Sequence, residues 1–202
     1  MRVFLTGVAC VGKTTVGARF ADLLGCLFFD LDLEIERFYE TSIERLQSRY
    51  LTSHSFRLAA SRALRHVLSQ VESSNWVIAL PPSGLMGSYW RVVKKTQGAT
   101  IVVLKDTPEN ILKRIIFYDM DSCQIQRGLT AREKDLYLRK VKGDITYFQP
   151  ILPESTYVCR HHRLRPRRSV AQGRRSVGDG AIEGTKARAG TNSRDGRQAC
   201  CR

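Results

Sequence analysis

The residues most able to do chemistry form a glycine-rich stretch near the N-terminus, GVACVGKTT, at residues 7–15. It fits G-x-x-x-x-G-K-[ST] between an apolar run and a predicted helix, the context in which this pattern binds phosphate. Its glycines let backbone N–H groups turn inward around phosphates, and the following helix adds its dipole. Lys13 is placed to reach the β- and γ-phosphates, and the Thr14 hydroxyl to bind Mg²⁺. The stretch predicts a nucleoside triphosphate site made by Gly7, Val8, Ala9, Cys10, Val11, Gly12, Lys13, Thr14 and Thr15.

Two carboxylates follow the second predicted strand, in the segment FFDLDLEIE. Asp30 and Asp32 are two residues apart, so on an extended segment they would project to the same side. The carboxyl ends of parallel strands border the crevice where open α/β sheets bind ligands. There, one carboxylate can hold a metal-bound water and the other can accept a proton from a phosphoryl acceptor. The alternative is an acidic surface turn, and Glu34 and Glu36 are interpreted as helix-start charges.

Together these motifs resemble the shikimate kinases, which are small P-loop kinases of the nucleoside-monophosphate-kinase type. The resemblance rests on GVACVGKTT, on FFDLD-x-x-IE and on Phe56-Arg57 opening a helix, and it extends over residues 1–147. It implies ATP-dependent phosphorylation of the 3-hydroxyl of shikimate with Mg²⁺, a step of aromatic amino acid biosynthesis. We therefore expect ATP and a shikimate-like acceptor as small-molecule partners.

The resemblance also implies roles for individual side chains. Asp30 would hold Mg²⁺ through water beside Thr14, and Asp32 would bind the shikimate hydroxyls and act as the base. Arg57 would pair with the shikimate carboxylate, because a guanidinium fork suits a carboxylate. Lys13, Asp32 and Arg127 are the expected catalytic residues.

The same resemblance predicts a mobile lid. The segment LKDTPENILKRI would precede it, with Arg114 stacked near the adenine or, alternatively, on a solvated helix face. Residues 119–129, DMDSCQIQRGL, are polar and are expected to form a lid without strands. Arg127 takes the place of the family's lid arginine, although a glycine follows it where the family usually has proline.

The acceptor side departs from the family in two places. The turn after the third strand carries Pro81, Pro82 and Ser83 where the family has three glycines, so two backbone donors are lost. Pro82 and Ser83 are nevertheless predicted to line the acceptor. The family also uses a late arginine for the carboxylate, and Arg139 and Lys142 are both candidates for it.

These residues require a scaffold of alternating strands and helices. Apolar runs predict strands at residues 2–5, 27–29, 76–80 and 100–104. Helices are expected after residue 12, with Val16, Phe20, Leu23 and Leu24 on the inner face, and at residues 42–45, 56–71 and 107–118. This alternation predicts an α/β three-layer sandwich with a mostly parallel sheet, of the P-loop NTPase, nucleoside-monophosphate-kinase-like type.

Composition divides the chain into a kinase domain, residues 1–150, and a basic tail, residues 151–202. The tail holds 12 of the 33 Lys and Arg but 4 of the 19 Asp and Glu, and has no apolar period, so we expect it to be disordered. Residues 155–159 are its one predicted strand, and the tail is interpreted as replacing the family's last strand and helix. The six scattered cysteines predict cytosolic thiols. We expect no export signal and no membrane span. The protein is expected to be cytoplasmic and monomeric.

Other functions remain open on the sequence alone. The altered turn allows a P-loop kinase for another hydroxylated acid or sugar. A nucleotide-binding regulatory protein with little transfer activity would keep the same loop. Nucleic-acid binding through the basic tail is disfavoured, because after Tyr157 there is no Phe, Trp or Tyr to stack on a base.

Overall fold

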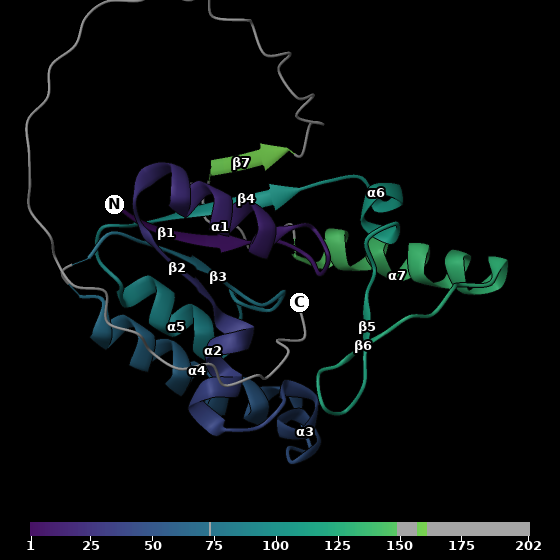
Figure 1. The fold of residues 1–202 in the computed structure, drawn as a ribbon, viewed down its shortest axis with the longest axis horizontal. Helices are drawn as coiled ribbons and strands as arrows, with labels where there is room; N and C mark the ends of the chain where they lie inside the picture. The colour runs from purple at the N-terminus through teal and green to yellow at the C-terminus, as the bar shows by residue number, and fades with distance from the viewer. Residues whose placement is uncertain (73, 149–156, 161–202) are drawn as a thin grey trace, which may run out of the picture. The chain divides into compact units, whose positions relative to one another are not determined.

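The computed structural model describes residues 1–72, residues 74–148 and the backbone of residues 157–160. Its centre is a five-stranded parallel sheet made of β1 (Arg2–Thr6), β2 (Leu27–Asp30), β3 (Trp76–Ala79), β4 (Ala99–Lys105) and β7 (Tyr157–Arg160) (Figure 1). The strand order is β2-β3-β1-β4-β7. The four strands predicted from apolar runs are therefore confirmed, and so is the mostly parallel sheet.

Alternate side chains of the central strands point into two separate cores. On β1, Phe4 packs into one core while Val3 and Leu5 pack into the other, as the period of a strand requires. Helices α2 (Leu31–Tyr39), α3 (Ile43–Ser48), α4 (Ser53–Gln70) and α5 (Gly87–Lys95) cover the Phe4 face. Helices α1 (Lys13–Leu24), α6 (Pro108–Leu112) and α7 (Ala131–Phe148) cover the other. This confirms the three-layer sandwich.

Helix α1 forms where expected, but it does not bury the predicted face. Its buried residues are the small ones, Gly17 and Ala21. Phe20, Leu23 and Leu24 are exposed instead, Leu23 by 77%. A Cβ on Gly17 would lie 2.6 Å from the ring of Phe28, so the helix lies too close to the sheet for large side chains on that face. The prediction from apolar periodicity was wrong here because close packing selects small residues.

The lid region differs from its prediction in two ways. Helix α6 ends at Leu112, well before residue 118, and the chain continues into β5 (Phe117–Tyr118). Strand β5 pairs antiparallel with β6 (Gln124–Ile125), so the lid is a small hairpin and the prediction of a strand-free lid was wrong. The hairpin's tip reaches α3 (Figure 1).

The strand predicted at residues 155–159 is confirmed as β7, which lies at the far edge of the sheet. Strand β7 pairs in parallel with β4, from Val102–Tyr157 to Lys105–Arg160. The tail therefore does not replace the fifth strand. The remainder of the tail, including its predicted disorder, lies outside the described residues.

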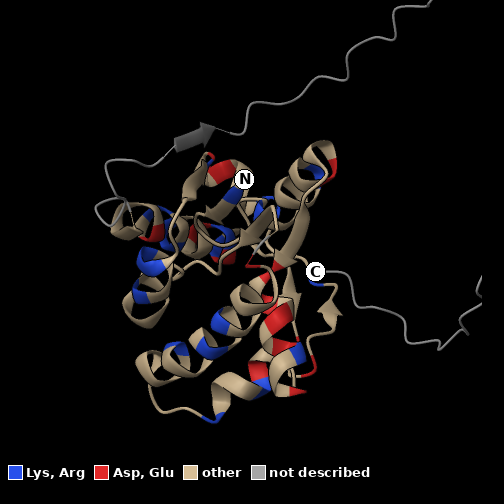
Figure 2. Ribbon diagram, turned by 90° about the vertical axis from the view of Figure 1, so that its left-hand side faces the viewer, with Lys and Arg blue, Asp and Glu red and all other residues tan. Residues whose placement is uncertain are grey.

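The described surface, thiols and helices can be compared with the composition of the chain. Lys and Arg are spread over several helices rather than gathered on one (Figure 2). Cys10 and Cys26 are free thiols. None of the helices in the described part of the chain combines the length and the apolar character that a membrane crossing needs.

The turn between β3 and α5 provides a test of the packing. A Cβ on Gly84 would lie 2.5 Å from the Cβ of Leu80 and 3.0 Å from the Pro81 carbonyl oxygen. We expect Gly84→Ala to lower the free energy of unfolding by about 1–3 kcal/mol, measured by urea denaturation. Gly143→Ala is the matched control, because its Cβ meets nothing within 4 Å and its helix α7 should gain about 0.5–1 kcal/mol. Equal stability of the two variants would contradict the tight turn.

Candidate active site

The phosphate-binding loop adopts a backbone that few residues tolerate. Gly7, Cys10 and Gly12 have positive φ angles of 145°, 56° and 97°. A Cβ at Gly7 would lie only 2.6 Å from the Leu104 carbonyl oxygen, so β4 approaches too closely for any other residue. Gly12 caps α1 without a side chain, which leaves the helix's first N–H groups facing the loop. The loop is therefore shaped as an anion site, as its motif predicts.

Lys13 folds back over this loop. Its ammonium group donates to the carbonyl oxygens of Gly7 and Val8, each at 3.0 Å. Burial lowers the pKa of Lys13, and the carboxylates of Asp32 and Asp30 only partly oppose that effect. The two carbonyl groups carry only partial negative charge. A phosphate in the loop would provide the full negative charge that stabilises the ammonium group of Lys13.

Asp30 connects the loop to the next helix. The Thr14 hydroxyl donates to Asp30 Oδ2 at 2.5 Å, while Asp30 Oδ1 accepts from the backbone N–H of Asp32 at 3.0 Å and so caps α2. Asp32 therefore lies in the first turn of a helix. The prediction that both aspartates share one side of an extended segment was wrong, because the capping preference of Asp30 starts the helix there.

The oxygen pair of Thr14 and Asp30 fits a magnesium ion. Both are hard oxygen donors, and Mg²⁺ is commonly held by one or two protein oxygens together with substrate phosphates. Within the described residues, no group of three or more His, Cys, Asp and Glu could hold a metal alone. A magnesium ion would thus depend on a bound nucleotide.

Most of the residues predicted to bind the acceptor lie on α2, on α4 and in the β3–α5 turn. Arg57, on α4, is half-buried and its Nε has no hydrogen-bond partner. Helix α5 begins beside it, since a Cβ on Gly87 would lie 3.8 Å from Arg57 Nε. In the turn, Pro82 and Ser83 are half-buried, and the Ser83 carbonyl accepts from Met86 N–H at 2.9 Å.

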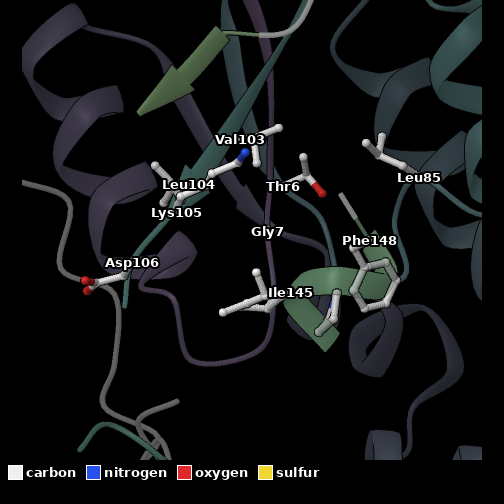
Figure 3. A pocket seen from close by; sticks show the side chains of 11 residues that line it. Thr6, Gly7, Leu85, Val103, Leu104, Lys105, Asp106, Ile145 and Phe148 are labelled. Carbon is white, nitrogen blue, oxygen red and sulfur yellow. The ribbon is translucent and has the colours of Figure 1, made fainter. Parts of the chain in front are cut away.

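A cavity of about 210 Å³ adjoins the start of the loop. Figure 3 shows Gly7 between Thr6, the end of β4, and Ile145 and Phe148 of α7. Pro82 and Leu85 line it from the β3–α5 turn, so the turn and the loop share one space. Most of its lining is apolar, which suits an organic group better than a phosphate.

Arg114 is held in place by a carboxylate. It follows α6 and forms an ion pair of 2.5 Å with Asp106, which borders the cavity. Burial raises the pKa of Asp106, but hydrogen bonds from Asn110, Thr107 and Arg114 outweigh it and lower that pKa overall. Arg114 is therefore an anchored side chain, and its stacking on adenine stays a prediction.

The lid hairpin is attached to α3 by polar contacts. Ser42 donates to the Met120 carbonyl, and Arg45 pairs with Asp121 at 2.7 Å. The buried Ser122 hydroxyl lies 2.6 Å from Glu36 and 2.5 Å from Glu44. Glu36 thus supports the lid, a role that its interpretation as a helix-start charge did not include.

Arg127 is paired with a carboxylate outside the phosphate loop in this structure. It pairs with Glu133 at the start of α7, and its guanidinium lies 5.6 Å from the Phe117 ring centre. Reaching a transferred phosphoryl group would require Arg127 to leave Glu133, so its catalytic role stays a prediction.

The two candidates for a late carboxylate ligand differ in their direction on α7. Both Arg139 and Lys142 are exposed. At 100° per residue, Lys142 lies about 60° around the helix from the cavity-lining Ile145, whereas Arg139 lies about 120° from it. Helix geometry therefore favours Lys142 over the predicted Arg139, whose role remains untested.

The structure thus brings Lys13, Thr14, Asp30 and Asp32 together around the loop and keeps Arg127 and Arg139 outside that group. It adds Tyr89, which sequence reasoning missed. Tyr89 is fully buried at the start of α5. Burial raises the pKa of its hydroxyl, Asp32 raises it further, and Arg57 lowers it. Helix α5 was not predicted either, although its buried Tyr89, Val92 and Val93 have the i, i+3, i+4 spacing of a helix face.

Fold and loop together define the class: an α/β P-loop protein with its phosphate-binding loop at the carboxyl end of a strand in a parallel sheet. Comparison with known proteins gives the family. The sequence profile of shikimate kinase matches residues 9–140, and the chain belongs to the shikimate kinase family.

Individual relatives agree. The chain is 33% identical to the shikimate kinase of Chlorobaculum parvum over 114 residues, covering 56% of this chain and 58% of that protein. The shikimate kinase structure from Bacteroides thetaiotaomicron superimposes with a TM-score of 0.63 at 24% identity, over 78% of this chain and 84% of that one. The Acinetobacter baumannii shikimate kinase, solved with shikimate, gives 0.58 at 25%, over 78% and 82%. The chain thus spans just over half of the length of the Chlorobaculum parvum shikimate kinase.

Lys13 should be essential for nucleotide binding. We expect Lys13→Met to reduce phosphoryl transfer by at least about 10²-fold, because the buried cation facing the phosphates is lost. Mg·ATP at a hundredfold its dissociation constant should stabilise the wild type by about 2.7 kcal/mol in thermal unfolding, and this gain should vanish in the variant. Lys134→Met, at an exposed position on α7, is the control. Full ATP stabilisation of Lys13→Met would contradict the assignment.

The two roles of Asp30 can be separated. Asp30→Asn keeps a helix cap and should unfold like the wild type, whereas Asp30→Ala should lose about 1 kcal/mol in urea denaturation. Both variants lack the carboxylate and should need about tenfold more Mg²⁺ for half-maximal transfer. If the magnesium dependence were unchanged in both, Asp30 would not be the metal-binding residue.

Proposed function

We propose that this chain transfers the γ-phosphoryl group of ATP to a hydroxyl group of shikimate, with Mg²⁺ held by Thr14 and Asp30. The observation that carries this proposal is the pair of hydrogen bonds at Asp30, 2.5 Å from Thr14 and 3.0 Å from the Asp32 N–H. One side chain joins the phosphate loop to the helix turn that carries Asp32. Membership of the shikimate kinase family supports the choice of acceptor.

Each group then has a defined task in the transfer. Asp32 orients the acceptor hydroxyl and takes its proton as the oxygen attacks the γ-phosphorus. The bond from that phosphorus to the bridging oxygen of ADP breaks, and Lys13 balances the charge on the phosphates. The magnesium ion would contribute further neutralisation of that charge. Arg57 holds the acceptor carboxylate, and Arg127 adds positive charge once the lid moves it from Glu133.

A different hydroxylated acid is the second candidate, and a specific observation favours it. Pro81 and Pro82 supply no N–H group at the turn beside the cavity, so the acceptor cannot receive backbone hydrogen bonds from them. Of the turn residues Pro81, Pro82 and Ser83, only Ser83 keeps a backbone N–H, so side chains must supply more of the acceptor contacts. Shikimate satisfies this requirement through Asp32 and Arg57, but another acid of similar size would also do so.

The proposal is tested by ADP release from ATP in the presence of shikimate and a panel of hydroxylated acids and sugars. We expect turnover with shikimate, and a decrease in kcat of about 10²–10⁴-fold in Asp32→Asn, because the proton acceptor is lost. Asp22→Asn, an exposed carboxylate on α1, should leave kcat unchanged. Turnover with another acid alone would change the substrate, and ATP binding without any turnover would favour a regulatory protein.

A further inference from the structure

Tyr89 carries a buried hydroxyl without a partner. Its side chain is completely buried in the first turn of α5, and its Oη has no hydrogen-bond partner. Among the described residues, Arg57 Nε and Arg114 Nε are also buried without a partner, and Arg57 lies close to the start of α5, which carries Tyr89. Buried donors without acceptors are costly and uncommon, so two of them at one place suggest a missing partner.

The two donors lie on neighbouring helices at the acceptor side. Helix α5 begins next to Arg57, where a Cβ on Gly87 would lie 3.8 Å from Arg57 Nε. Burial raises the pKa of Tyr89, with Asp32 as the next contributor, so the hydroxyl keeps its proton and remains a donor. No side chain caps the start of α5, which leaves the helix's positive end open beside them.

A nearby tyrosine shows the contrast. Tyr39 packs against the same core, and its hydroxyl donates to the Ala59 carbonyl at 2.9 Å. Its hydrogen bond is made within the protein. Tyr89 has the same chemistry in the same core but lacks such an acceptor.

We propose that Tyr89 is an acceptor-binding residue whose hydroxyl donates a hydrogen bond to the carboxylate of the phosphoryl acceptor, alongside Arg57. This inference rests on the proposed function and specifies how that site recognises its substrate. A carboxylate offers several lone pairs, enough for a phenol and a guanidinium together. Asp32 repels a carboxylate, so the substrate is oriented with its hydroxyl groups toward Asp32 and its acid group toward Tyr89 and Arg57.

This arrangement also accounts for the unusual turn. Pro81 and Pro82 withdraw two backbone donors, and both candidates for the late arginine, Arg139 and Lys142, are exposed. Tyr89 supplies a rigid, fully buried donor in compensation. The carboxylate of the acceptor is then recognised by Arg57 on α4 and Tyr89 on α5.

The test compares wild type, Tyr89→Phe and Tyr39→Phe. Each is assayed with ATP and the acid that the wild type phosphorylates, and with an analogue in which a hydrogen atom replaces the carboxylate. We expect Tyr89→Phe to lower kcat/KM for the acid about tenfold through KM, with the KM for ATP unchanged. The same variant should use the analogue as well as the wild type does. Its urea midpoint should equal or exceed that of the wild type, because an unpartnered hydroxyl is removed.

The matched control should behave in the opposite way. Tyr39→Phe loses an internal hydrogen bond, so its urea midpoint should fall while its KM for the acid stays near that of the wild type. An unchanged KM in Tyr89→Phe, or an equal loss with the carboxylate-free analogue, would overturn this inference and leave the proposed function intact. A wild type that phosphorylates no hydroxylated acid would overturn both.

Discussion

The site depends on one carboxylate that accepts hydrogen bonds with both of its oxygens. Asp30 receives the Thr14 hydroxyl on one oxygen and the N–H group of Asp32 on the other. The first bond ties the residue to the phosphate loop, and the second starts α2. Because α2 begins at this bond, the position of Asp32 relative to the loop is set by the same side chain that can hold a metal ion. In the proposed function, Asp30 therefore couples the nucleotide and acceptor halves of the site.

Among the described residues, several polar side chains of the site lack a hydrogen-bond acceptor or a charge that fully balances their own. Lys13 is desolvated against two carbonyl groups, and Arg57 and Tyr89 bury donors without acceptors. These features cost free energy in the unliganded chain, and a substrate that satisfies them recovers that cost as binding. Their buried donors and cations are suited to anionic substrates, a phosphate at the loop and a carboxylate between α4 and α5.

The order of strands and helices was largely predictable, because buried parallel strands appear as continuous apolar runs. The burial of α1 was not. Periodicity placed Phe20, Leu23 and Leu24 inward, but the distance between helix and sheet admits only Gly17 and Ala21. The lid hairpin was missed because its strands have only two residues each, which is too short for a recognisable pattern. Their pairing also forms only after the chain folds back.

The sequence by itself determined the phosphate loop and the chemical types around it, since spacing along a strand–loop–helix unit dictates where Lys13 and Thr14 lie. Only the tertiary structure decided which distant groups meet. Asp32 lies on a helix turn because Asp30 caps it, and Arg127 is paired with Glu133 rather than with the loop. Tyr89 joins the acceptor side because α5 packs against α4. Local spacing encodes local geometry, whereas contacts between helices depend on how both pack on the sheet, which no single segment specifies.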